Sequence, residues 1–493
     1  MKANSGDVYT VYNKYLKCYT ACQVAYIAPP DNVSKQYWAI IVSLDWMGNE
    51  PLTTEEIPYL KPIYKDFMYW NRELHLLKVS VDVPSNYIFV GNIPSLTNES
   101  CYSYGNWDNG YDVYLQLSWQ SIPEGKRLLF KKAMNSNDEI MLGDNSVKIC
   151  THRIMDRYTP FDSALELKAL PCLSEIVCEK WHSDLLGFLK DCPFIHELTL
   201  TNHNQKKLDF RGTSVTKLMI DMKGLDELWL SEKTEQLLFQ NENPDNCIIH
   251  AKDKGSLLTV QFIGEYHPHP ELSNLWGLHG IKIKNFDLSN LSSIHPQLKE
   301  LRLWGEPGNL QNFSSLSNLQ YLTNFSTYDL FGFSSSDIPS PKQMPNLKWF
   351  WMTSLPEDAA KDVKAKWKNT KDIKLRITKP RKSEWLAQNL DNPFRNWDGS
   401  EHIPQACAEK AANQYRKTRA QLLKLAINND DISQSKAIES IIAYTQTFNK
   451  MQFIETIERD EIYMALCNIL EAMPASCINK KELLNKFEEL RDF

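Results

Sequence analysis

The chain has 493 residues, a formal net charge of −6, 42% hydrophobic residues and 24% charged residues. This length is too great for one compact core, so several domains or a repeat array are expected, and the acidic balance disfavours a nucleic-acid partner. No apolar stretch approaches the roughly 20 residues of a membrane span, no signal segment follows Met1, and the eleven cysteines are scattered, which predicts a cytoplasmic protein with reduced thiols.

Residues 1–155 form a segment with its own composition, because most of the 21 tyrosines lie there. Tyrosines at helical spacing predict a helix within 8–24. Runs rich in Val, Ile and Tyr, bounded by turn-forming residues, predict strands at 37–44, 76–81, 87–90 and 113–118. We interpret this segment as an aromatic-rich α+β domain of unknown family.

Residues 156–378 carry a repeated phrase: apolar, two residues, apolar, one residue, apolar. It recurs about every 20–22 residues, and one copy between 220 and 262 is degenerate. A related phrase that begins at Leu225 arrives half a period early, which predicts a strand on another side of the repeat array. The regular copies begin at Leu173, Ile195, Val215, Leu257, Leu278, Leu298 and Leu347, with a weaker copy at Leu319. No repeat of this kind buries its apolar face alone, so the copies must stack and their ends need caps.

Alternation along a strand predicts which side chains of each copy point outward. The early copies supply acidic and small residues, whereas the later copies supply cations and aromatic residues, the types enriched at interface hot spots. The alternative for Trp349 and Trp351 is packing beneath the C-terminal helices. The predicted surface for a protein or peptide partner comprises Lys282, Lys284, Arg302, Trp304, Tyr321, Phe325, Trp349 and Trp351.

Residues 379–493 predict a helical domain. Apolar stripes at helical spacing mark four helices, at 404–427, 434–450, 453–473 and 480–491. Asn479 with Glu482 predicts a capping box at the start of the last helix. The basic run 379–382 is interpreted as a solvated linker rather than a nucleic-acid site.

The segment Asp391–Gly399 is the most distinctive short string in the chain. Its Asn-Pro and Asp-Gly pairs are turn formers, and two aromatic residues supply apolar anchors. We expect an ordered junction that docks the helical domain on the last repeat, with Arg395 paired to Asp398 or Asp391. The alternative is a recognition loop.

No catalytic or metal-binding signature accompanies these patterns. The chain has no Gly-rich phosphate loop, no HExxH and no GxSxG. Cys18 and Cys22, like His267 and His269, lack the further ligands that a metal ion needs. We therefore predict no catalytic residues, no metal and no cofactor. An enzyme with an unrecognised site, in the first domain or at its junction with the repeats, is the alternative; a Cys–His pair or perturbed carboxylates there would favour it.

The repeated phrase resembles the leucine-rich-repeat superfamily over about 200 residues, which implies a solenoid. The usual turn asparagine is largely missing, so the repeats are irregular and number about eight or nine. The string Asp391–Gly399, followed by Phe453–Ile462, is similar to the C-terminal part of bacterial repeat proteins labelled molybdate metabolism regulators or gliding-motility proteins. That similarity implies a bacterial cytoplasmic protein with an interaction role and no catalytic residues.

These patterns together predict an α+β fold in three parts. An aromatic-rich α+β domain covers 1–155, a leucine-rich-repeat-like solenoid covers 156–378, and a helical C-terminal domain covers 379–493. The predicted function is non-catalytic protein–protein interaction through the concave face of the solenoid, as a scaffold, a regulator or an immunity-type binding protein.

Overall fold

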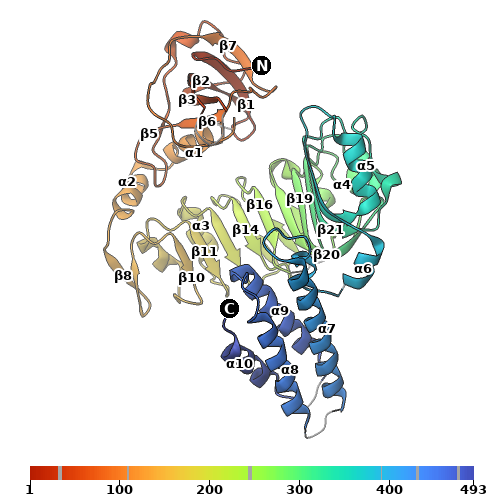
Figure 1. The fold of residues 1–493 in the computed structure, drawn as a ribbon. Coiled ribbons are helices and arrows are strands. Elements are labelled where there is room, and N and C mark those ends of the chain that lie inside the picture. Colours follow the sequence, from red (N-terminus) through yellow and green to blue (C-terminus); the bar gives the residue numbers. More distant parts are fainter. Residues whose placement is uncertain (31–35, 108–109, 242–246, 390, 429–431, 475–477) are drawn as a thin grey trace. The chain divides into compact units, whose positions relative to one another are not determined.

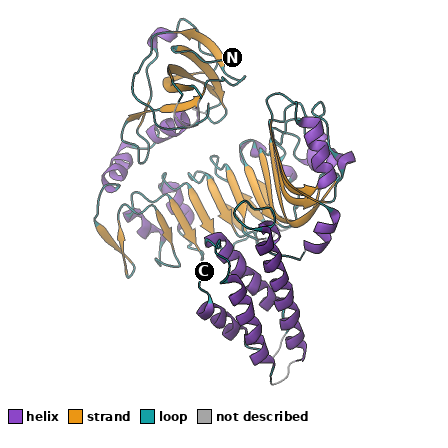
Figure 2. Ribbon diagram, in the orientation of Figure 1, coloured by secondary structure: helices purple, strands orange, loops and turns teal. Residues whose placement is uncertain are grey.

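The computed structural model describes residues 1–30, 36–107, 110–241, 247–389, 391–428, 432–474 and 478–493. These residues form two compact units, Met1–His279 with Ser293–Lys299, and Gly280–Ser292 with Glu300–Phe493. The fold is mixed α and β: both units contain parallel β-structure, and the second also carries the C-terminal helices (Figures 1 and 2). The three-domain division stays a prediction, although strand β23 (Lys374–Arg381) runs past the boundary expected at 378.

The first unit begins with a five-stranded antiparallel sheet in the order β6-β3-β2-β1-β7 (Figure 1). Its strands are β1 (Asp7–Asn13), β2 (Cys18–Ala28), β3 (Trp38–Gly48), β6 (Leu76–Ser80) and β7 (Ile88–Asn92). The last three confirm predicted strands. Two short hairpins and two helices complete this part: β4 (Tyr64–Lys65) with β5 (Glu73–Leu74), β8 (Glu139–Leu142) with β9 (Asn145–Lys148), α1 (Gly110–Gln120) and α2 (Glu124–Ala133).

Two predictions for this part are wrong. The helix expected within 8–24 is the β1–β2 hairpin, and the strand expected at 113–118 lies in helix α1. The hairpin buries both of its faces, since Val8 and Tyr9 are neighbours in sequence but belong to different cores. A strand buried on both faces shows no alternation, so its spacing cannot be told from that of a helix.

The repeats of the first unit supply six parallel strands that are hydrogen-bonded in chain order (Figure 2). They are β10 (Arg153–Met155), β11 (Glu175–Cys178), β12 (Glu197–Leu200), β14 (Lys217–Ile220), β16 (Gln236–Phe239) and β18 (Thr259–Ile263). Strand β16 is the degenerate copy. The early phrase forms β15 in a separate sheet, as predicted, with β13 (Lys207–Asp209), β15 (Glu227–Trp229) and β17 (Ile248–His250).

The second unit continues with longer strands. They are β19 (Gly277–Asp287), most of which belongs to this unit, β20 (Glu300–Gln311), β21 (Asn324–Phe331), β22 (Trp349–Pro356) and β23. Strands β20 to β23 are parallel neighbours.

Short helices and 3₁₀ turns connect the strands of both units. Apart from the C-terminal helices, the second unit contains α5 (Glu357–Trp367), α6 (Ser383–Asn389), η5 (Phe313–Asn318), η6 (Ser335–Asp337) and η7 (Arg395–Trp397). The first unit contains α3 (Leu185–Asp191), η1 (Ile57–Tyr59), η2 (Ala164–Ala169), η3 (Lys252–Gly255) and η4 (Pro270–Leu272), and the residues of α4 (Leu291–Ile294) are shared between the units.

The pairing register corrects one predicted copy by three residues. Phe325 pairs with Leu301 on one side and Phe350 on the other, and all three side chains are fully buried. The copy therefore begins at Leu322 instead of Leu319, and Phe325 points inward rather than outward. Tyr321 lies in the turn before the strand. Both leucines are buried, so the apolar pattern alone fitted two registers.

Strands β21, β22 and β23 each bend at a left-handed residue. These residues are Asp329, Ser354 and Lys379, with φ of 54°, 56° and 49°. The residues directly before these bends are Tyr328, Thr353 and Thr378. Tyr328 pairs with Thr353, and Thr353 pairs with Thr378, so the three form one row across the strands. Such a conformation costs of order 1–3 kcal/mol at a non-glycine residue and persists only where its surroundings impose it. In β20 the same row ends at Trp304, and Gly305 follows it, where a Cβ would lie 2.2 Å from the carbonyl oxygen of Asp329.

The segment Asp391–Gly399 docks on these bends. Arg395 Nε donates to Asp329 Oδ2 at 2.6 Å, and the Asp329 side chain is fully buried. Ser354 Oγ donates to the other carboxylate oxygen at 2.9 Å. Lys379 Nζ donates to the carbonyl of Asn396 at 2.9 Å. The predicted junction is confirmed, but Arg395 pairs with Asp329 on β21 instead of Asp391 or Asp398.

The basic run 379–382 is not a solvated linker. Lys379 and Arg381 belong to β23 and both contact the docked segment. Arg381 Nη1 donates to Asp398 Oδ2 at 2.8 Å, and its guanidinium lies 3.8 Å from the centre of the Trp385 ring. Burial lowers the pKa of Lys379 and of Arg381. These two cations are thus used inside the protein.

The four predicted C-terminal helices are confirmed (Figure 1). They are α7 (Gln405–Asn428), α8 (Ser433–Phe448), α9 (Thr456–Ala472) and α10 (Lys480–Leu490). Asn479 caps the last helix by accepting a hydrogen bond from the Glu482 amide at 3.2 Å. Phe394 and Trp397 of the docked segment belong to the apolar core of these helices, and Trp397 Nε1 donates to Glu461 Oε2 at 2.6 Å. The docked segment therefore joins the strands to the helices.

We predict that Arg395→Ala lowers the free energy of unfolding by about 3–5 kcal/mol, because it leaves a buried carboxylate unpaired. Asp329→Asn should cost less, since asparagine is neutral and tolerates the left-handed conformation. In the Asp329→Asn background, adding Arg395→Ala should cost little. Urea unfolding of the four proteins measures the coupling, with exposed Lys382→Ala as the control. Additive losses would contradict the assigned pair.

His295, a buried histidine of the first unit, should make the stability of the protein depend on pH. His295 Nδ1 donates to the carbonyl of Leu272 at 3.0 Å, and Nε2 accepts from the Tyr266 hydroxyl. Burial lowers the pKa of His295 to about 4 from an ordinary 6.5. The folded state therefore holds the neutral ring, whereas the unfolded state takes up a proton as the pH falls below 6.5.

The contribution of His295 to the free energy of unfolding should be present in full above pH 6.5. It should fall by about 3 kcal/mol as the pH decreases toward 4. Urea unfolding across this window, in the parent protein and in His295→Gln, measures the difference. The variant should show a shallower decline toward low pH. Parallel curves for the two proteins would show that another group causes the decline.

Candidate functional site

A groove opens on the outward face of β20, β21 and β22, with a cavity volume of about 650 Å³. We call it the aromatic groove. Its lining residues are Arg302, Trp304, Asn324, Phe325, Ser326, Thr327, Tyr328, Trp349, Trp351 and Thr353. Phe325 is fully buried and forms part of the floor. Four residues predicted to bind a partner, Arg302, Trp304, Trp349 and Trp351, thus meet in one groove, whereas Phe325 borders it only as an inward-facing buried residue.

The indole rings of the aromatic groove stand on rigid strands and reach the surface. Trp304 is 47% exposed and Trp349 is 38% exposed. Trp349 and Trp351 occupy alternate positions of β22, with ring centroids 6.0 Å apart. Trp351 Nε1 donates to Thr353 Oγ1 at 2.9 Å, which fixes that ring. These two rings contact each other and Thr353 within β22, and they contact Lys374 and Arg376 of β23.

Cations lie beside the aromatic rings. The Arg376 guanidinium is 4.6 Å from the Trp351 ring centre, and Lys374 Nζ is 5.5 Å from that of Trp349. Arg302 Nε lies 3.0 Å from Glu300 Oε1. These three cations lie around the rings, and Arg302 is paired with Glu300.

Tyr328 links the groove to the buried charges behind it. Burial, and to a smaller extent the neighbouring Asp329 carboxylate, raise the pKa of Tyr328 to about 12. The phenol therefore stays protonated at neutral pH and presents a hydrogen-bond donor at the groove. Its position is fixed because the next residue, Asp329, pairs with Arg395.

Three predicted residues lie outside the lining of the aromatic groove. Lys282 and Lys284 are exposed on β19, and Lys282 has a positive φ of 53°. Tyr321 is 49% exposed but precedes β21. Their predicted role in partner binding stays a prediction without support from the groove.

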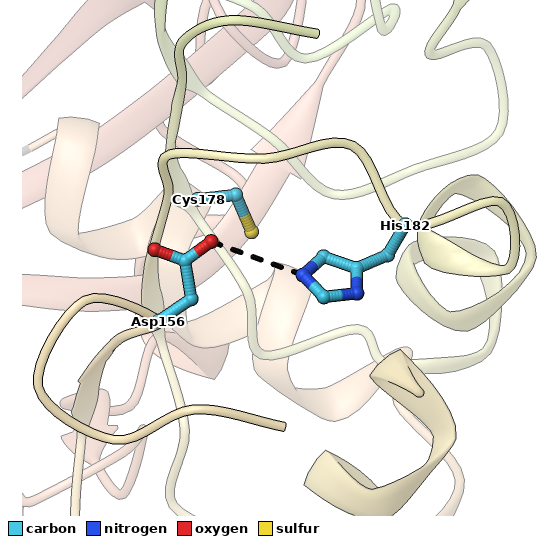
Figure 3. A group of neighbouring side chains, drawn as sticks. All are labelled: Asp156, Cys178 and His182. Carbon is cyan, nitrogen blue, oxygen red and sulfur yellow. Dashed lines mark ion pairs between the residues drawn. The ribbon is translucent and has the colours of Figure 1, made fainter. Parts of the chain in front are cut away.

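A second group of reactive side chains meets inside the first repeats (Figure 3). Asp156 follows β10, Cys178 ends β11, and His182 lies in the turn before α3. All three are buried, and one potential ligand atom from each lies within 4.8 Å of the other two. Asp156 accepts hydrogen bonds from the backbone amides of Glu179 at 2.9 Å and Lys180 at 3.2 Å.

This cluster was missed in the sequence, although Cys178-x-x-x-His182 is a visible signal. The phrase placed Cys178 in the core, and Asp156 is distant in sequence and joins the group only through the parallel pairing of β10 with β11. The residue types are those of a Cys–His nucleophile pair with an orienting carboxylate. Burial, however, raises the pKa of the Cys178 thiol to about 12, whereas a nucleophilic cysteine needs a lowered pKa.

Comparison with known proteins gives little. No family model matches the chain, and no curated protein matches it. A crystal structure of internalin C2 from Listeria monocytogenes aligns with a TM-score of 0.21 and 16% identity, covering 50% of this chain and 90% of that chain. A likeness at that score does not decide the fold. Within the described part of the chain, none of the helices combines the length and apolar composition of a membrane span.

We predict that Cys178 resists alkylation by iodoacetamide in the native protein at neutral pH and reacts fully in denaturant, because the buried thiol stays protonated. Cys150, which is partly exposed, serves as the internal control. Peptide mass spectrometry measures both sites. Rapid alkylation of native Cys178 would instead reveal an activated thiol and favour an enzyme.

Proposed function

We propose that this protein binds a protein or peptide partner, without catalysing a reaction, through the aromatic groove. The single observation that carries the proposal is the convergence of Trp304, Trp349 and Trp351, which are partly exposed on β20 and β22, the strands on either side of β21. Large aromatic residues and arginine at the centre of a concave surface are the usual hot spots of protein interfaces. Rigid strands present them with little loss of conformational entropy on binding.

The charges of the groove favour an acidic partner. Arg302, Lys374 and Arg376 surround the indole rings, and charge complementarity guides association and excludes competing partners. A partner segment with one apolar anchor and flanking carboxylates would satisfy both the rings and the cations. Scaffold, regulator and immunity-type protein are all compatible with such binding, in a bacterial cytoplasmic setting.

The fold that we infer behind the groove is an irregular leucine-rich-repeat-like solenoid. Its support is the strand ladder, in which the apolar positions of successive copies pair directly, as Ile176 pairs with Leu198 and Leu198 with Leu218. Such arrays use one face of their strands as an extended binding surface.

An enzyme remains the second candidate, for one specific reason. Asp156, Cys178 and His182 converge in the first repeats, near the position where an unrecognised active site was expected. Their burial and the raised pKa of the thiol weigh against nucleophilic catalysis. The alkylation experiment on Cys178 decides between these alternatives.

We expect the triple variant Arg302→Ala, Trp304→Ala and Trp351→Ala to lose its partner while keeping its fold. Truncating each hot-spot residue costs about 2 kcal/mol or more, roughly 30-fold in affinity. Quantitative affinity capture from the native host, with circular dichroism to verify folding, measures the loss. Tyr59→Ala is the control, because Tyr59 is an exposed tyrosine of the first unit, 83% accessible, and is not among the predicted binding residues. Equal capture by the folded triple variant would refute the proposal.

A further inference from the structure

We propose that Asp156, Cys178 and His182 bind a transition-metal ion of the zinc class. The proposal is independent of the function assigned to the aromatic groove. It starts from geometry: a carboxylate oxygen, a thiol sulfur and an imidazole nitrogen lie within 4.8 Å of one another, and all three residues are buried. In Figure 3 the imidazole edge faces the carboxylate, and the sulfur lies close to both.

The imidazole has an unsatisfied nitrogen. His182 Nε2 is buried and has no hydrogen-bond partner among the described residues. Its neighbour Asp156 Oδ2 is 3.8 Å away, which is too long for a hydrogen bond. A buried polar atom without a partner lowers the stability of the folded state by about 1–3 kcal/mol. A ligand that binds this nitrogen would remove that cost.

A metal ion fits the space between the groups. Zinc lies about 2.0–2.1 Å from histidine nitrogen, about 2.0–2.2 Å from carboxylate oxygen and about 2.3 Å from sulfur. Tetrahedral angles then separate the nitrogen and oxygen ligands by about 3.3 Å. The observed 3.8 Å between His182 Nε2 and Asp156 Oδ2 needs to close by about half an ångström, and Cys178 Sγ lies within 4.8 Å of both groups. Three protein ligands leave one position for water.

The donor set selects the class of metal. Nitrogen with sulfur and one oxygen suits Zn²⁺ or Co²⁺, whereas Mg²⁺ and Ca²⁺ prefer oxygen ligands. The thiol must lose its proton on binding, and a bound divalent cation supplies the charge that makes this favourable.

The surrounding residues already hold two ligands in place. Phe161 stacks on the His182 ring, with centroids 4.5 Å apart. The backbone amides of Glu179 and Lys180 donate hydrogen bonds to the Asp156 carboxylate. Outer contacts of this kind orient the ligands of metal sites.

The site occupies a position where a metal ion would stabilise the fold. Strand β10 lies at the edge of its sheet and spans only Arg153–Met155. Terminal repeats have a neighbour on one side only and need extra stabilisation. A metal held by the residue after β10, the last residue of β11 and the turn before α3 would fasten this first repeat.

The test uses the full chain, stripped with a chelator and titrated with Co²⁺ alone. We expect one equivalent to bind, with the absorption bands of tetrahedral cobalt and of a thiolate–cobalt bond. Chelator should also lower the melting temperature of the zinc-loaded protein. His182→Gln and Cys178→Val should lose stoichiometric binding, whereas Cys247→Ser, which alters another buried thiol, should retain it.

Two results would overturn the proposal. One is no stoichiometric binding by the folded parent chain. The other is unchanged cobalt spectra in folded His182→Gln, which would place the metal elsewhere. If Cys178→Val fails to fold, His182→Gln and the thiolate–cobalt band of the parent chain still decide the outcome.

Discussion

The second unit depends on one buried ion pair, that of Asp329 with Arg395. A carboxylate with no solvent exposure is tolerated only when a partner compensates its charge. Asp329 sits at a left-handed bend of β21, so its backbone is also strained. Both costs are offset by the same contact, because Arg395 bonds the carboxylate and Ser354 bonds its second oxygen. The docked segment therefore belongs to the fold of the strands.

This constraint reaches both the helices and the groove. Phe394 and Trp397 flank Arg395 and enter the core of the C-terminal helices, so the ion pair determines where that core meets the strands. Tyr328 precedes Asp329, and Thr353 precedes Ser354. On β21 and on β22, the last residue that lines the aromatic groove therefore lies directly before the bend. Changes in the docked segment should thus reach the groove through the backbone of β21 and β22.

Periodicity in the sequence predicted the regular parts of this structure. The four C-terminal helices and most repeat strands followed from apolar spacing, because each buries one face and its pattern shows it. The β1–β2 hairpin did not, since it buries two faces. The copy at Leu322 was misplaced because Leu319 is buried as well, and only backbone pairing distinguishes the two registers.

The candidate sites were predictable to different degrees. Trp304, Trp349 and Trp351 followed from alternation along their strands, whereas Phe325 and Tyr321 inherited the register error. The partner of Arg395 was not predictable, because Asp329 is 66 residues away in sequence and nothing local marks it. The Asp156, Cys178 and His182 cluster has the same origin, since parallel pairing brings together residues one repeat apart.

The two polar clusters solve related problems in different ways. A stack of parallel strands stabilises its middle members from both sides and its end members from one side. At β23 the chain uses a docked segment, with Lys379 and Arg381 bonded to Asn396 and Asp398. At the β10 end, Trp119 of α1 and Phe130 of α2 pack with Cys172 and Phe194 of the first repeats, while β10 itself is short. A metal ion bound by Asp156, Cys178 and His182 would add three ligand bonds at this end. These bonds would hold β10 in place, as the hydrogen bonds of the docked segment hold β23.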